Sequence, residues 1–487
     1  MPGPSTGTMA PRSRVLVALL AAALASACAS NPVSGRREVS LISEAEEIAL
    51  GRQGDSEIRR EMGVYADDEL QRYVSGIGER IASVSHRPTL PWTFTVVDVP
   101  AVNAFALPGG YIYVTRGLLA HLSDESELAG VLGHEVGHVT ARHASQQYTR
   151  SAGGGIGVLL ASIFVPGLRP FSDLASAGLG TWFLKYGRDD ELESDRLGVE
   201  YASKAGWDPE SVPRFLETLS RLDATSARGV PNWLSTHPDP GSRVVKARPV
   251  AATFVDGERE RNRDDYLRRI DGLSYGDDPA EGVVRAHQFL HPGLRIALDF
   301  PEGWDVQNSS EQVVAQADGG NTLMLMRSAD EVRGTALADG AQRHMKGLGF
   351  TFESGRVQPV SGLDGFVGLY RGKAKGVGPV RIRAAHVVVG RQVFMVAGVA
   401  PDADFARADG DFTTALASFR ELTSPEASAI RPNRLGLYDA KAGDSWQSIA
   451  QRAGRGLVPA ARLALMNGFA VNVQPPPGTR LKIVLEG

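Results

Sequence analysis

The stretch GHEVGH at residues 133–138 constrains this chain more than any other feature of its sequence. His134 and His138 are four residues apart, so on an α-helix they differ by only about 40° around the axis and both imidazoles can reach one metal ion. Glu135 follows the first histidine, where a carboxylate can lie beside a metal-bound water as a general base without becoming a ligand. The motif therefore predicts a helix that carries two metal ligands and a base.

The surrounding residues predict the helix itself. In SDESELAGVLGHEVGHVTARH, residues 123–143, Asp124 and Glu127 have the spacing of a capping box. An apolar face follows them, formed by Leu128, Val131 and Leu132. His143 lies about 140° around a continuous helix from His138, so we expect it to face away from the metal.

A catalytic zinc ion also needs a third protein ligand and an open position for water. The segment RDDELESDRLGVEYA, residues 188–202, is helical in pattern and lies about fifty residues beyond the histidine motif. Its spacing alone does not choose among four acids: Asp190, Glu191, Glu193 and Asp195. A solvated acidic helix face is the alternative interpretation.

The first thirty residues indicate export. Arg12 and Arg14 precede the run VLVALLAAALASAC, whose apolar core is too short to span a bilayer and ends in small residues. Ala25 and Ala27 fit an A-x-A cleavage site, whereas LASAC resembles a lipoprotein box that ends at Cys28. We favour the lipoprotein interpretation, because the single cysteine stands where acylation requires it. A lipid there would anchor the chain to a membrane and leave no cysteine for a disulfide.

The net charge limits the kinds of partner that we expect, and the length limits the number of domains. The 487 residues carry a formal net charge of -4. Residues 1–27 contain two arginines and no acids, so their removal changes the net charge from -4 to -6. This balance gives no reason to expect nucleic acid as a partner. The length accommodates two to four domains.

We expect four segments along the chain: a lipoprotein signal peptide at 1–27, a catalytic domain at 28–268, an accessory α+β domain at 269–430, and a tail domain at 433–487. The catalytic segment alternates helical patterns with strands such as WTFTVVDV and YIYVT. The accessory segment contains several strand candidates and ends in the helical DFTTALASFREL. Its histidines are scattered, as is typical of surface or packed side chains: His287, His291, His344 and His386.

Three blocks carry a family resemblance: NAFALPGGYIYVTRGLL, SDESELAGVLGHEVGHVTARH and ELESDRLG. In this order they resemble the HtpX-type and CAAX-endopeptidase family of zinc metallopeptidases, in its soluble exported branch, over roughly residues 40–245. The resemblance implies an α+β fold with a zincin-like, mainly helical metallopeptidase domain, a small edge-strand sheet and one Zn²⁺ per chain. The family's third ligand is the first glutamate of an E-x-x-[AS]-D pattern, which is Glu191 here.

The resemblance also implies a role for each site residue. The zinc ligands would be His134, His138 and Glu191. Glu135 would be the base. Asp195, one helical turn after the third ligand, would orient a ligand or an arginine, and Arg243 is the candidate partner on family pattern.

Soluble relatives carry a T-H-P stretch similar to the one in LSTHPDPGSRVVKA, residues 234–247. His237 could stabilise the oxyanion, or bind zinc as a fourth ligand and hold the enzyme latent; the alternative is a loop histidine that caps the next helix. The block NAFALPGGYIYVT resembles the family's edge strand over the cleft, where an extended peptide would pair through main-chain hydrogen bonds. The candidate substrate contacts are Asn103, Ala104 and Phe105, and ordinary strand packing is the alternative.

The tail resembles the LysM domain. AGDSWQSIA, LALMNG and PGTRLKI match its order and spacing over about fifty residues, with Trp446 at an aromatic position. The tail predicts strand, helix, helix and strand, with Asp444 or Ser445 as the cap of the first helix. The resemblance implies a βααβ LysM domain that binds N-acetylglucosamine-containing glycans, chiefly peptidoglycan. A packed domain that has lost its ligand is the alternative.

These resemblances imply a zinc-dependent endopeptidase of the bacterial cell envelope that cleaves misfolded or unassembled envelope proteins. We expect it to be exported, periplasmic and lipid-anchored to the outer membrane through Cys28, with peptidoglycan as a second partner. Two alternatives stay open. One is a chaperone or binding module with a latent metal site, and the other is a peptidoglycan-peptide hydrolase.

Overall fold

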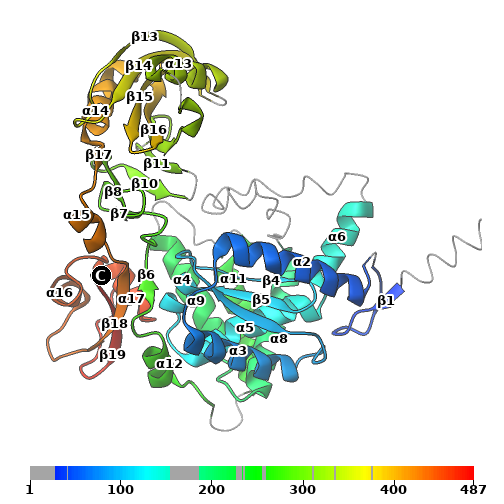
Figure 1. The fold of residues 1–487 in the computed structure, drawn as a ribbon. Helices are drawn as coiled ribbons and strands as arrows, with labels where there is room; N and C mark the ends of the chain where they lie inside the picture. Colours follow the sequence, from blue (N-terminus) through cyan, green and yellow to red (C-terminus); the bar gives the residue numbers. More distant parts are fainter. Residues whose placement is uncertain are drawn as a thin grey trace, which may run out of the picture. The chain divides into compact units, whose positions relative to one another are not determined.

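The computed structural model describes residues 28–40, 42–153, 186–225, 233, 236–254, 259–309, 312–317, 319–333, 336–374 and 377–487. The expected signal peptide at 1–27 lies outside these ranges. The chain divides into two compact units (Figure 1). The first comprises the chain up to Leu273 together with Leu435–Ile483, and the second comprises Ser274–Arg434 with Val484–Gly487.

A small mixed sheet lies within the first unit, in the order β3-β5-β4. Strand β3 (Thr93–Val97) pairs in parallel with β5 (Tyr111–Thr115), and β4 (Ala104–Leu107) pairs with β5 in the antiparallel direction. The strands predicted from WTFTVVDV and YIYVT are confirmed as β3 and β5. In the part of the chain that the structure describes, β4 is an edge of this sheet.

Helices surround the sheet (Figure 1). They are α2 (Glu44–Met62), α3 (Asp68–Ser83), α4 (Arg116–His121), α5 (Glu125–Thr140), α6 (His143–Gly153), α8 (Arg188–Lys204), α9 (Ser211–Thr225), α11 (Pro240–Ala251) and α12 (Arg263–Arg269). A short strand pair, β1 (Cys28–Ser30) with β2 (Arg37–Val39), precedes them. No helix among the described residues is long and apolar enough to cross a membrane.

The helix predicted around GHEVGH is confirmed as α5, and every one of its residues is buried. Asp124 is its N-cap and accepts a hydrogen bond from the amide of Glu127. The carboxylate of Glu127 accepts a hydrogen bond from the amide of Ser123, one residue before the cap. The helix packs against α3, α8, α9 and β4, so neighbours on several sides fix its position.

Glycines let α5 and α8 approach each other closely. A Cβ atom added at Gly133 would lie 3.0 Å from the carbonyl oxygen of Gly198, and one added at Gly198 would lie 3.0 Å from the amide nitrogen of His134. A side chain at either position would push the helices apart. Because neither glycine has a side chain, α5, which carries the histidines, can lie close to α8, which carries the acids.

The predicted strand, helix, helix and strand of the tail are confirmed. They are β18 (Asn433–Asp439), α16 (Trp446–Arg452), α17 (Ala460–Met466) and β19 (Arg480–Leu485). Ser445 is the N-cap of α16, and Trp446, Ile449 and Ala450 of that helix are buried. Within the first unit, the Nζ atom of Lys482 donates hydrogen bonds to the carbonyl oxygens of Ala120 and Leu122, at 2.8 and 2.5 Å.

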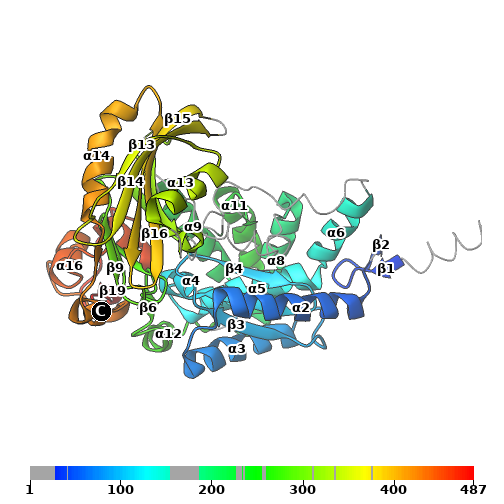
Figure 2. The ribbon, with the colours of Figure 1, turned by 45° about the horizontal axis from the view of Figure 1, so that its top comes forward.

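The second unit is an α+β structure. Its antiparallel sheet has the order β10-β11-β12-β16-β15-β14-β13, with bounds Asp305–Asn308, Gln312–Gln316, Leu323–Ser328, Gln392–Pro401, Gly378–Val389, Gly365–Ala374 and Thr351–Val357. A second sheet has the order β17-β9-β8-β7, with bounds Arg420–Glu421, Ile296–Asp299, Gln288–His291 and Val283–Arg285. Figure 2 shows α13 (Leu337–Gly347) and α14 (Phe405–Ser418) on opposite faces of the larger sheet.

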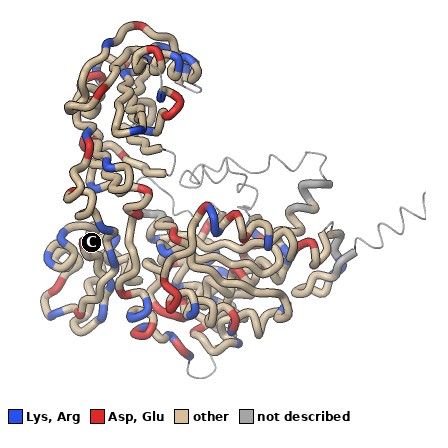
Figure 3. The backbone as a smooth tube through the Cα atoms, in the orientation of Figure 1, with Lys and Arg blue, Asp and Glu red and all other residues tan. Residues whose placement is uncertain are grey.

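Two histidines of this unit are paired. His386 on β15 is fully buried, and its Nε2 atom lies 2.9 Å from Nδ1 of His344 on α13. These two histidines are packed side chains, as expected, and the packing of α13 on the sheet joins them although they are far apart in sequence. Elsewhere, acidic and basic residues are interspersed along both units (Figure 3).

Candidate metal centre

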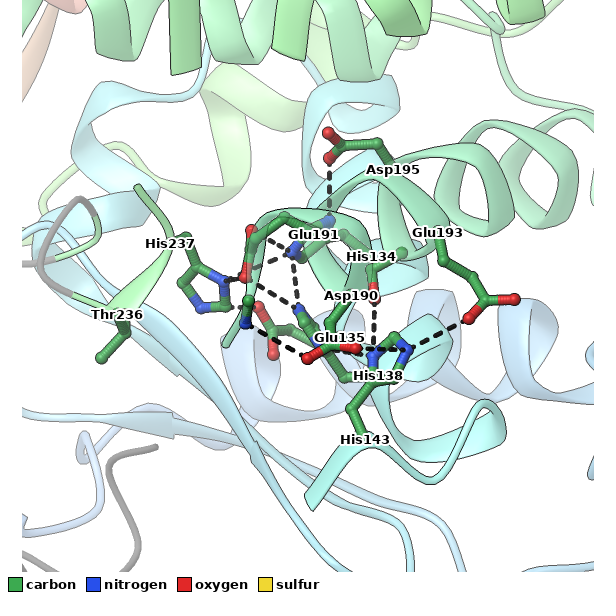
Figure 4. Close-up of polar contacts among 12 residues, drawn as sticks. His134, Glu135, His138, His143, Asp190, Glu191, Glu193, Asp195, Thr236 and His237 are labelled. Carbon is green, nitrogen blue, oxygen red and sulfur yellow. Dashed lines mark hydrogen bonds and ion pairs between the residues drawn. The ribbon is translucent and has the colours of Figure 1, made fainter. Parts of the chain in front are cut away.

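Four side chains from three segments converge at the centre of the first unit (Figure 4). His134 and His138 come from α5, Glu191 from α8, and His237 from the residues before α11. One nitrogen or oxygen atom of each lies within 4.8 Å of the corresponding atoms of the other three. The Nε2 atoms of the two α5 histidines are 3.0 Å apart, and Nδ1 of His237 is 2.9 Å from Oε1 of Glu191.

Burial sets the protonation states of these groups. It lowers the pKa values of His134, His138 and His237 below the ordinary histidine value, which favours the neutral imidazole that binds metals. Burial raises the pKa of Glu191 to about 7, although the nearby Arg243 opposes this change. Neutral imidazoles beside a desolvated carboxylate form a ligand set that zinc accepts.

The environment of Glu135 also indicates a site for a cation. Its side chain is fully buried, and neither carboxylate oxygen has a hydrogen-bond partner within the described ranges. Burial, and next the charge of Glu191, raise its pKa well above the usual range. A buried, unpaired carboxylate is costly unless a cation or a proton is close. The residues present therefore fit a divalent metal ion with a carboxylate beside it.

Asp195 and Arg243 contact the clustered side chains and fix their positions. Oδ1 of Asp195 lies 2.9 Å from Nδ1 of His134. Arg243 donates two hydrogen bonds to Asp195, at 2.7 and 2.8 Å, and its Nη1 atom lies 2.7 Å from Oε2 of Glu191. Burial would raise the pKa of Asp195, but Arg243 and His134 hold it below the usual range. The structure therefore brings together Asp195 and Arg243, the pair that the family pattern suggested.

His143 is not part of the metal cluster, as expected, but the continuous helix on which that expectation rested is wrong, and His143 contacts His138. Helix α5 ends at Thr140, Arg142 has a φ of 61°, and α6 begins at His143. The turn places Nδ1 of His143 2.9 Å from Nδ1 of His138, and Nε2 of His143 3.2 Å from Oε2 of Glu193. Nothing in VTAR marks this break, since neither glycine nor proline is present.

Two aromatic residues of the site carried no recognisable sequence signal. Tyr186 stacks on His138 at 3.9 Å between ring centroids, and Trp233 stacks on His237 at 4.2 Å. Both aromatic side chains are buried. They restrict the orientation of the imidazoles and keep water from their faces.

The candidate substrate strand lies beside this cluster. Asn103 is fully buried directly before β4, and neither its amide nitrogen nor its amide oxygen has a hydrogen-bond partner within the described part of the chain. The main chain of Ala104 hydrogen-bonds to His237. Phe105 stacks on Tyr113 at 4.9 Å within an apolar cluster, so its ring packs in the core.

Comparison with known proteins agrees with this chemistry. Residues 68–251 match the model of Peptidase family M48. The chain is 28% identical over 348 residues to the beta-barrel assembly-enhancing protease of Escherichia coli (strain K12), which covers 67% of this chain and 71% of that protein. It is 30% identical over 311 residues to the protein of that name from Yersinia pestis, covering 59% and 63%.

A second group of relatives comes from eukaryotes. The chain is 34% identical over 186 residues to the mitochondrial metalloendopeptidase OMA1 of Arabidopsis thaliana, which covers 38% of this chain and 36% of that protein. The matched part of the chain contains all four clustered side chains. Residues 68–251 are therefore similar to Peptidase family M48, and the protein is a protease.

Proposed function

We propose that this protein is a zinc-dependent endopeptidase of the bacterial cell envelope, in the HtpX-type exported branch, that cleaves misfolded or unassembled envelope proteins. The observation that carries the proposal is the buried cluster of His134, His138 and Glu191, with the carboxylate of Glu135 in hydrogen-bond contact with no described residue and 3.7 Å from Nε2 of His237. Clustered nitrogen and oxygen donors of this kind suit one zinc ion per chain.

The residues divide the chemistry among them. His134, His138 and Glu191 hold the ion, which when bound supplies the Lewis acidity that activates water and polarises a peptide carbonyl. Glu135 takes a proton from the attacking water and returns it to the leaving amine.

The edge of β4 is the proposed substrate site. An extended polypeptide can add to this edge through main-chain hydrogen bonds, which gives affinity with little dependence on sequence. Asn103 has an unpaired buried amide at the start of the strand, so it can bind the peptide main chain. Ala104 and Phe105 contribute their main chains. A preference for extended chains agrees with unfolded or unassembled proteins as substrates, as does the name of the Escherichia coli relative.

The role of His237 determines whether the proposed enzyme is active or latent. Its Nδ1 atom lies 3.4 Å from Nε2 of His134 and 2.9 Å from Glu191, so it is close enough to act as a fourth ligand. A permanent fourth ligand would exclude water and favour the second candidate function, a chaperone or binding module for envelope proteins. Otherwise His237 stabilises the oxyanion. Faster casein cleavage by His237→Ala than by the natural protein would indicate latency, and slower cleavage would indicate oxyanion stabilisation.

Localisation and tethering complete the proposal. Acylation of Cys28 anchors the protein to the outer membrane on its periplasmic side, and the LysM-like tail binds peptidoglycan. The order of helices and strands in the tail supports this assignment. A hydrolase of peptidoglycan peptides is the third candidate, because the tail would hold the site near the wall. Release of peptides from purified muropeptides would favour it over protein degradation.

Zinc removal and restoration test the proposed function. Dialysis against a chelator should abolish cleavage of unfolded casein, and one equivalent of Zn²⁺ should restore it, whereas Mg²⁺ should not, because nitrogen donors favour zinc. Circular dichroism before and after dialysis controls for unfolding. Full activity in metal-free protein would contradict the proposal.

A further inference from the structure

A cavity of about 330 Å³ lies in the first unit between the tail, α9 and the residues around α12. Six charged side chains line it: Arg214, Arg221, Arg261, Arg263, Glu127 and Glu217. No residue of the metal cluster is among the lining residues. The charged groups of the wall therefore sum to a positive charge even with both glutamates ionised.

Arg263 is the arginine best placed to receive an anion. Its Nη1 atom donates to the carbonyl oxygen of Ser123 at 2.5 Å, and its Nη2 atom donates to the carbonyl oxygen of Arg480 at 3.1 Å. In the described ranges it has no carboxylate within ion-pair distance, whereas Arg221 pairs with Glu217. Carbonyl oxygens orient a guanidinium without neutralising it, so its charge is available to a ligand.

Two buried polar atoms of the wall lack hydrogen-bond partners, although Nε of Arg214 lies 3.8 Å from Oε1 of Glu127. Oγ of Ser123 and Nε of Arg214 have no hydrogen-bond partner among the residues that the structure describes. Ser123 precedes α5 and Arg214 belongs to α9, so these donors come from different elements that face one cavity. Buried polar groups are rarely left unpaired, which indicates that something polar binds between them.

The tail completes the wall and is held in place by buried hydrogen bonds. It contributes residues 467–469 and Thr479 to the lining. The side chain of Asn467 bonds to the main chain of Leu463 and Lys482, and Nζ of Lys482 bonds to the α4–α5 connection. The cavity is thus a fixed feature of the docked tail.

We propose that this cavity binds a small monocarboxylate, such as the free C-terminal end of a short peptide. The carboxylate would accept hydrogen bonds from Arg263 and from Oγ of Ser123. Glu127 and Glu217 in the same wall disfavour a phosphate dianion more than a carboxylate monoanion. The volume exceeds that of a bare carboxylate and leaves room for one or two attached residues. The site is independent of the proposed zinc chemistry.

The test is isothermal titration of the full chain with N-acetyl-Ala-Ala as the probe. Its C-terminal amide, which lacks the charge, and inorganic phosphate serve as comparison ligands. Arg263→Gln removes the guanidinium, and Ser123→Ala removes the unpaired hydroxyl without changing the hydrogen bonds of Asn467 and Lys482 that hold the tail. Arg268→Gln is the matched control, since Arg268 lies on the same helix, is exposed and does not line the cavity.

The acid should bind at least tenfold more tightly than its amide and than phosphate. Arg263→Gln and Ser123→Ala should each weaken the acid by about tenfold, while Arg268→Gln leaves it unchanged. Equal affinity for the acid and the amide would overturn the proposal, as would tighter binding of phosphate. So would unchanged binding in Ser123→Ala, a substitution small enough to preserve the fold.

Discussion

At the scale of single residues, Asp195 connects the metal site to Arg243. It lies against His134 on one side and binds the guanidinium through both oxygens on the other. In Asp195→Asn the amide cannot balance the buried Arg243, and His134 loses the group that fixes its ring. We expect zinc affinity to fall by about 10- to 100-fold and the melting temperature to fall as well, because the buried Arg243 keeps Glu191 as a partner but loses its two hydrogen bonds to a charged Asp195.

Zinc competition with a chromophoric chelator, together with thermal unfolding, measures both effects. The matched control is Glu200→Gln on the same helix, whose side chain pairs with Arg196 and Lys204. An Asp195→Asn protein with the zinc affinity of this control would mean that Asp195 does not orient the ligand.

The sequence predicted most of this site but not all of it. The spacing of His134 and His138 on a helix places both on one side, and the structure brings Glu191 and His237 to them. Their roles as ligands stay predictions. His143 could not be placed, because its position depends on a helix break without a local signal. Tyr186 and Trp233 join the site through tertiary packing alone.

At the scale of elements, the contact between α5 and α8 positions the ligands. A side chain at Gly198 would meet the main chain at His134 at 3.0 Å. We expect Gly198→Val to lower stability by about 1–3 kcal/mol through overpacking and to weaken zinc binding by moving Glu191 away from the histidines. Chemical denaturation and zinc titration measure the two losses.

A glycine on a different helix controls for that substitution. An added Cβ at Gly76 on α3 would meet no atom within 4 Å. Gly76→Ala should therefore raise stability by about 0.5–1 kcal/mol, since alanine loses less entropy in a helix. If Gly198→Val behaved like Gly76→Ala, the close approach of α5 and α8 would not matter for the site.

Elements with strong local patterns were predictable, and others were not. The strand candidates of the accessory segment are confirmed, among them as β12, β14, β15 and β16. The two-residue β6 (Ser274–Tyr275) forms only because it pairs with β18, so no local signal precedes it. The order of strands in the larger sheet also depends on long-range pairing that the sequence pattern does not specify.

At the scale of the whole molecule, the buried His344–His386 pair predicts sensitivity to acid in the second unit. Burial lowers the pKa of His386 to about 3, from an ordinary 6.5, and the charge of His344 adds to this effect. Glu331 and Arg327 lie close to His344. Between pH 6.5 and 3 the unfolded chain binds a proton at His386 that the folded chain does not, so stability is lost as pH falls.

We expect the second unit to lose about 2 kcal/mol from this group at pH 5. Hydrogen exchange of the β15 amides, corrected for intrinsic rates, measures the loss. His386→Gln should remove this part of the pH dependence, and His287→Gln is the control. Identical pH profiles in the two variants would contradict the account.

The packing of the tail lies beyond what local patterns can predict. Its helices and strands followed from turns and apolar spacing, but the bonds of Lys482 to Ala120 and Leu122 join positions more than 350 residues apart. Those contacts place Leu435–Ile483 in the same compact unit as the peptidase domain.

The central claim is that Glu135 acts as the base beside a zinc ion. The most direct measurement compares casein cleavage by the natural protein and by Glu135→Gln, with the zinc content of each sample determined. We expect cleavage to fall by at least about 100-fold in the variant, with one zinc retained per chain. Equal cleavage by both proteins, or a natural protein that is active without zinc, would contradict it.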